Sequence, residues 1–143
     1  MSDSPPSMRP RRVLETALYV DDLERAAAFY TGVMGLRAMF GTDRLVALDA
    51  GEGTVLLLFR RGLTAEGLRT DGGWLPPHDG SGPVHVAFAI DREALPAWRT
   101  RLSESGVAIE SELTWPRGGV SLYFRDPDGH SLELATPGVW QVY

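Results

Sequence analysis

The sequence predicts an α+β fold in which two tandem βαβββ modules form a cupped mixed sheet around a central cleft. Strand-like and helical segments follow one another in the same order twice along the 143 residues. The two runs also align, because ETALYVDD at 15–22 matches HVAFAIDR at 85–92. Two equivalent units that cannot each cover their own sheet are expected to pack side by side.

Module one is predicted over residues 13–61. Its first strand is VLETALYV at 13–20, and Asp21 and Asp22 then offer an N-cap for a helix that Gly35 ends. Apolar residues recur at helical spacing between these signals: Leu23, Ala26, Ala27, Tyr30, Val33 and Met34. Three short strand signals complete the module: LRAMFG, LVALDAG and TVLLLFRR.

Module two is predicted over residues 83–136 and repeats this order. The strand PVHVAFAI leads into a helix that should begin near Glu93, because Pro96 is tolerated only in a first helical turn. That helix ends at Gly106, and the strands VAIESELTW, VSLYFRD and HSLELAT follow.

The remaining segments are predicted to lie outside the two modules. Residues 62–82 are rich in Gly and Pro, and a structureless connection of this length is unusual inside a compact domain. We therefore expect an inter-module crossing, a flap over a site, or both. Residues 1–12 are expected to be a mobile tail, and 137–143 a C-terminal extension.

Composition excludes several classes of function. The net charge of −5 argues against a nucleic-acid binder, and no apolar run approaches the roughly 20 residues of a membrane helix. The first residues have no hydrophobic signal-peptide core, so we expect a cytoplasmic protein. There is no cysteine, and all 14 basic residues are arginine, so thiolate ligands and lysine Schiff bases are excluded.

Three strands carry an ionisable side chain on a face that otherwise holds mostly small residues: Glu15, His85 and Glu133. Glu15 and His85 occupy equivalent positions in the two repeats, so pseudo-twofold packing would bring them together. Two carboxylates and an imidazole in one hollow would be unfavourable without a divalent cation, and three protein ligands would leave positions open for a substrate. Leu57 occupies the position equivalent to Glu133, so a fourth ligand is not expected.

A simpler interpretation stands beside this one. A single Glu on an amphipathic strand is usually solvated, and a single His in a strand is more often hydrogen-bonded in a core. The matched repeat positions and the shared small-residue faces favour the metal site.

The segments ETALYVDDLERAAAFYTGVMGL, GPVHVAFAI and SLYFRDPDGHSLELAT resemble the vicinal oxygen chelate superfamily. That family includes glyoxalase I, fosfomycin-resistance thiol transferases, bleomycin-resistance proteins and extradiol dioxygenases. The resemblance implies a divalent-metal cleft, commonly in a homodimer, with Glu15, His85 and Glu133 as ligands. Thiol transferases and dioxygenases of the family carry His where this chain has Glu15, which disfavours ferrous oxygen chemistry.

The resemblance implies a metal-dependent lyase, isomerase or transferase acting on a small oxygenated substrate that the metal chelates. Nickel, cobalt, zinc and manganese suit one nitrogen and two oxygen ligands, with iron less favoured. Glu15 or Glu133 could also take a proton from the substrate. The alternatives are a ligand-sequestering protein like the bleomycin-resistance proteins and, ranked third, an extradiol dioxygenase.

Further site residues are predicted around these ligands. Tyr123 is a catalytic candidate, because the SLYFRDPDGH run resembles fosfomycin enzymes whose Tyr lies near the substrate. Four further residues are candidates for substrate contact. Ser121 shares the strand face of Tyr123, and Tyr19 shares that of Glu15. Arg117 could clamp an anionic substrate, and His78 could act as an acid or base on the flap.

Overall fold

The computed structural model describes residues 8–143 and confirms the α+β fold with two βαβββ modules. Module one comprises β1 (Glu15–Val20), α1 (Leu23–Gly32), β2 (Arg37–Gly41), β3 (Leu45–Asp49) and β4 (Val55–Arg60). Module two comprises β7 (His85–Ala89), a 3-10 turn (Arg92–Ala94), α2 (Leu95–Glu104), β8 (Ser111–Thr114), β9 (Val120–Arg125) and β10 (Ser131–Ala135). Residues 1–7 of the predicted tail lie outside the described residues.

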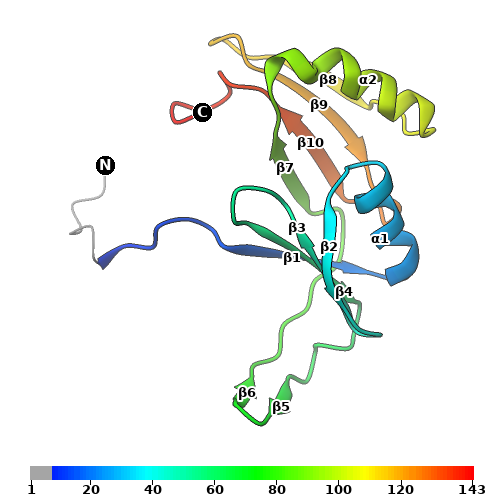
Figure 1. The fold of residues 1–143 in the computed structure, drawn as a ribbon, viewed down its shortest axis with the longest axis vertical. Coiled ribbons are helices and arrows are strands. Elements are labelled where there is room, and N and C mark those ends of the chain that lie inside the picture. The colour runs from blue at the N-terminus through cyan, green and yellow to red at the C-terminus, as the bar shows by residue number, and fades with distance from the viewer. Residues whose placement is uncertain (1–7) are drawn as a thin grey trace.

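The modules form two separate mixed sheets rather than one continuous sheet. Their strand orders are β1-β4-β3-β2 and β7-β10-β9-β8, so the first strand of each module is an edge strand. β1 pairs with β4 in parallel and β7 pairs with β10 in parallel, while the other neighbours are antiparallel. Figure 1 shows the two sheets lying at a steep angle to each other, with α1 and α2 each packed beside its own sheet.

The helix signals of the sequence are confirmed. The Asp22 side chain caps α1 by accepting a hydrogen bond from the Arg25 N–H at 3.0 Å, and Gly35 follows the helix with a φ of +76°. Pro96 lies in the first turn of α2, where its missing N–H costs no helical hydrogen bond. In residues 8–143, neither helix is long and apolar enough to cross a membrane.

The leucine-bearing faces of both sheets meet in one shared core. Leu18 and Leu58 of module one and Leu122 and Leu134 of module two are buried in the same cluster of side chains. Burying each leucine stabilises the fold by about 1.5–3 kcal/mol. Because side chains alternate along a strand, the other faces of the two sheets turn away from this core. Those outward faces carry the residues predicted to form the site.

The connection at 62–82 contains regular secondary structure. β5 (Leu68–Thr70) and β6 (Gly73–Leu75) pair as a hairpin around Asp71 and Gly72. The Asp-Gly dipeptide is a strong hairpin signal, but the surrounding Gly and Pro residues obscure it. The Arg69 guanidinium lies over the Trp74 ring, 5.6 Å from its centroid. Figure 1 shows the hairpin projecting away from both sheets.

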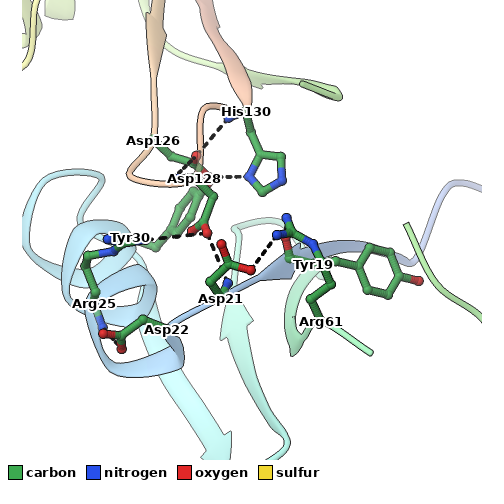
Figure 2. A network of polar contacts seen from close by, with 9 residues as sticks. All are labelled: Tyr19, Asp21, Asp22, Arg25, Tyr30, Arg61, Asp126, Asp128 and His130. Carbon is green, nitrogen blue, oxygen red and sulfur yellow. Dashed lines mark hydrogen bonds and ion pairs between the residues drawn. The ribbon is translucent and has the colours of Figure 1, made fainter. Parts of the chain in front are cut away.

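A buried polar network joins the two modules at the turn between β9 and β10 (Figure 2). The Tyr30 hydroxyl of α1 donates to Asp126 Oδ2 at 2.6 Å, and His130 Nδ1 lies 2.7 Å from the same oxygen. Asp126 Oδ1 accepts from the backbone N–H groups of Asp128 and His130. The Asp128 carboxylate in turn accepts from the Asp21 N–H at the end of β1. The turn therefore anchors module two to the β1–α1 junction.

This network predicts a pH effect on stability. Burial, and then the nearby Asp126 carboxylate, raise the pKa of Tyr30 far above its ordinary value of 10.0. A raised pKa means that the folded state keeps a proton that the unfolded state loses above pH 10. The contribution of Tyr30 is therefore complete below pH 10 and is lost as the pH rises further.

We expect Tyr30→Phe to make the alkaline loss of stability shallower by about 1.4 kcal/mol per pH unit above pH 10. At neutral pH the same variant should be less stable by about 1.5–3 kcal/mol, because a buried hydrogen bond to a carboxylate is lost. Urea unfolding of both proteins between pH 7 and 11 measures the two effects. If the free energy of unfolding fell equally steeply with pH in both proteins above pH 10, the alkaline loss of stability would not come from Tyr30.

Candidate metal centre

Two of the three predicted ligands lie together on the outward face of module two. His85 pairs with Ser131 across the parallel β7 and β10 strands, which places His85 and Glu133 on one face. His85 Nε2 lies 3.1 Å from Glu133 Oε1. The His85 side chain is 49% exposed, whereas that of Glu133 is 8% exposed. Glu133 is thus buried against the sheet, whereas the His85 ring is accessible from solvent.

The hydrogen bonds of His85 determine which of its nitrogens can bind an ion. Nδ1 lies 2.8 Å from the Ser131 carbonyl oxygen, which can only accept, so Nδ1 carries a proton. In the neutral ring, Nε2 then directs its lone pair toward the Glu133 carboxylate. Two acceptors facing each other at 3.1 Å need a proton or a cation between them.

The donor set fits a divalent metal. Two atoms bound to the same ion at about 2.1 Å lie about 3.0–3.4 Å apart, which includes the separation of His85 Nε2 and Glu133 Oε1. A histidine ligand whose other nitrogen donates to a backbone carbonyl is the usual arrangement in metal sites. One imidazole and one carboxylate suit nickel, cobalt, zinc or manganese.

Glu15 does not join this pair within one chain. It lies exposed at the first residue of β1 and lines a cavity of about 750 Å³ between the two edge strands, together with Val86 of β7 and Trp98 of α2. Among residues 8–143, no group of three His, Cys, Asp or Glu side chains could hold a metal ion. The three-ligand set therefore stays a prediction, with two members adjacent in the structure.

Ser121 and Tyr123 lie on β9 beside the pair, as their alternation predicts. Tyr123 pairs with Glu133 across the sheet, and its ring lies 6.2 Å from the His85 ring, centroid to centroid. Burial raises the pKa of Tyr123, with Glu133 adding to the rise and Ser121 opposing it, so the phenol stays protonated at neutral pH. Ser121 is fully buried, and its hydroxyl donates to Glu133 Oε2 at 2.5 Å.

Trp115 is a site residue that the sequence analysis missed. It follows β8, and its indole N–H donates to Ser121 Oγ at 2.8 Å. No motif indicates this contact, since it depends on the pairing of β8 with β9. That pairing places Leu113, two residues before Trp115, opposite Ser121.

The other predicted contact residues lie elsewhere. Tyr19 and His78 come together, with the Tyr19 hydroxyl 2.6 Å from His78 Nδ1 and Phe59 packed against both rings. Tyr19 lies on the face of β1 that carries Glu15, and His78 of the connection contacts it there. Arg117 is exposed in the turn between β8 and β9.

A family model for the glyoxalase/bleomycin resistance protein/dioxygenase superfamily matches residues 12–134. The chain belongs to this superfamily. The crystal structure of a lactoylglutathione lyase of Agrobacterium tumefaciens aligns with this chain at a TM-score of 0.84 and 34% identity, covering 92% of this chain and 98% of that one. The resemblance seen in the sequence motifs is therefore confirmed.

Two curated relatives are transferases by name. Glutathione transferase FosA of Serratia marcescens is 30% identical over 120 residues, which cover 82% of this chain and 74% of that protein. Metallothiol transferase FosB of Bacillus licheniformis is 42% identical over 58 residues. That match covers 40% of this chain and only 38% of the length of the relative.

Proposed function

We propose that this protein is a divalent-metal-dependent lyase, isomerase or transferase of the glyoxalase-like type, acting on a small oxygenated substrate. The observation that carries the proposal is the His85–Glu133 pair, whose facing acceptor atoms need a cation or a proton between them. The similarity to a lactoylglutathione lyase and to named thiol and glutathione transferases supports the same reaction classes.

We further propose that a second copy of the chain supplies Glu15. Glu15 and His85 are both exposed on the outward faces of their sheets, and the edges of β1 and β7 have no strand partner within residues 8–143. Exposed apolar residues flank both edges, among them Val13 and Leu14 before β1 and Val84 before β7. Unpaired edges with apolar flanks favour association, and a twofold dimer would create two equivalent sites.

The protein residues have distinct roles in this proposal. His85 and Glu133 of one chain and Glu15 of the other would hold the ion. When bound, the ion would polarise the substrate oxygens it chelates and stabilise negative charge that develops on them. Glu15 or Glu133 would accept a proton from the substrate carbon. Tyr123 stays a phenol, so it would donate a hydrogen bond to a substrate oxygen.

The Tyr19–His78 pair would serve as a wall of the substrate site. Within the connection, the His78 N–H donates to the Thr64 carbonyl oxygen and the Thr64 hydroxyl donates to the His78 carbonyl oxygen. Gly80 of the same connection packs against the Tyr19 ring of module one. Burial, and then Asp79, raise the pKa of Tyr19, so this phenol also remains a hydrogen-bond donor at neutral pH.

Metal analysis tests the proposal. The purified protein should bind about one divalent ion per chain, and Glu133→Ala should weaken binding at least 100-fold, because it removes one ligand of three. Glu112→Ala is the matched control, since Glu112 is exposed on β8 and pairs with Arg99. A wild-type protein that binds no divalent ion contradicts the proposal. Tight binding of an aromatic drug by such a metal-free protein would favour a sequestering role instead.

A further inference from the structure

We infer that Ser121 and Trp115 are positioning residues that orient Glu133 for metal binding, an inference that rests on the proposed function. Ser121 lies between Trp115 and Glu133 in one series of hydrogen bonds, and it contacts the carboxylate oxygen that is not paired with His85. This assigns to a fully buried serine a role other than substrate contact.

The direction of each hydrogen bond in this series follows from the number of protons that each group can donate. An indole N–H can only donate, so Trp115 occupies a lone pair of Ser121 Oγ. A serine hydroxyl has a single proton, and Glu133 Oε2 accepts it at 2.5 Å. Glu133 Oε2 is thereby engaged, while Oε1 is left facing His85 Nε2. The two oxygens of one carboxylate are thus assigned different partners.

Burial strengthens this arrangement. Ser121 is 0% exposed and Glu133 is 6% exposed, so no bulk water competes for the hydroxyl proton. Hydrogen bonds to a charged acceptor are roughly twice as strong as neutral ones, and low surrounding polarity strengthens them further. Without this bond, the Glu133 side chain could rotate about its χ angles. Its Oε2 atom would also be buried without a hydrogen-bond donor.

The turn that carries Trp115 is itself held in place. Trp115 and Gly119 close the turn between β8 and β9 with a backbone hydrogen bond of 2.7 Å. Gly119 packs against the backbone of Gly138 so closely that an added Cβ would lie 2.5 Å from it. The Thr136 hydroxyl oxygen also accepts from the Val120 N–H at 2.8 Å. The segment after β10 therefore fixes the turn, and the turn fixes the indole.

Cobalt(II) titration of the full-length protein tests the consequence for metal binding. Ser121→Ala and Trp115→Phe should each weaken Co²⁺ binding about 10-fold or more and alter the visible absorption of the bound ion, as is typical when a residue supporting a metal ligand is lost. Ser121→Thr keeps the hydroxyl, so its Co²⁺ affinity should stay within about threefold of that of the wild type. Ser111→Ala and Trp140→Phe are matched controls at exposed positions and should bind as wild type does.

A second measurement in the metal-free protein tests the chain of bonds itself. Hydrogen exchange of the Trp115 indole N–H, followed by NMR, should be slow in the wild type. It should accelerate about 10-fold or more in Ser121→Ala and Glu133→Ala, because either change removes or releases its acceptor. This readout stays valid if Ser121→Thr or Trp115→Phe fails to fold, and it needs no bound ion.

The outcomes separate the two proposals. Unchanged Co²⁺ affinity and spectrum in both Ser121→Ala and Trp115→Phe would overturn the positioning role, even if Glu133→Ala abolishes binding. An indole N–H exchange rate that is unchanged in Ser121→Ala and Glu133→Ala would overturn the positioning role as well. A wild-type protein that binds no Co²⁺ would refute the proposed function and, with it, a role for these residues in metal binding. The indole exchange would then show only whether the hydrogen bonds from Trp115 through Ser121 to Glu133 exist.

Discussion

Asp126→Ala should lower the free energy of unfolding by about 3–5 kcal/mol, because several buried donors lose their acceptor at once. The side chain accepts from the Tyr30 hydroxyl, from two backbone N–H groups and from the His130 ring, at distances of 2.6–3.0 Å. Each buried donor left without a partner costs about 1–3 kcal/mol. Part of that cost is relieved where water enters the space left by the carboxylate.

Urea unfolding and thermal unfolding both measure this loss, and the melting temperature should fall by roughly 10–15 °C. Asp43→Ala is the matched control, because Asp43 is exposed in the turn before β3, and it should change stability by less than about 0.5 kcal/mol. A loss below 1 kcal/mol for Asp126→Ala would show that the junction between the modules does not depend on this carboxylate.

Mixing Glu15→Ala protein with Glu133→Ala protein should restore metal binding that neither variant has alone. If Glu15 of one chain joins His85 and Glu133 of the other, each mixed dimer has one intact site and one site that lacks both carboxylates. With random exchange of chains, half of the dimers are mixed, so about a quarter of the wild-type number of sites should return. Equilibrium dialysis against Co²⁺ after exchange of subunits measures this fraction.

The matched control is a mixture of His85→Ala with Glu133→Ala. Both residues belong to module two and would serve the same site, so no mixed dimer contains an intact set and no binding should return. Recovery in the control mixture would argue against His85 and Glu133 of one chain serving the same site. No recovery in the test mixture would argue against a Glu15 supplied by the second chain. A chain that remains monomeric at every concentration would lead to the same conclusion.

Most of the fold could be predicted from the sequence, because its signals are local and are repeated. Asp22, Gly35 and Pro96 mark helix ends by their own backbone and side-chain chemistry, and the structure has each of them in the predicted place. The angle between the modules could not be predicted in this way. It depends on contacts such as that between Tyr30 and Asp126, which are 96 residues apart in the chain.

The candidate site could be predicted in part for the same reason. His85 and Glu133 are neighbours because β7 and β10 pair in parallel, and the alternation of small and bulky residues indicated the shared face. Repeat symmetry placed Glu15 with them, but the two modules of one chain meet through their leucine faces instead. The contact of Trp115 with Ser121 depends on the pairing of β8 with β9, for which the sequence has no separate signal.

The exposure of Glu15 determines how readily this position tolerates substitution. Residue 15 lies at the start of an edge strand, apart from the shared core, the Asp126 network and the hydrogen bonds around Ser121. Substitutions at such a position are usually close to neutral for stability. In the proposed site, a change of residue 15 would therefore alter the metal chemistry with little effect on folding. A change of Glu133 would also remove the acceptor of the buried Ser121 hydroxyl.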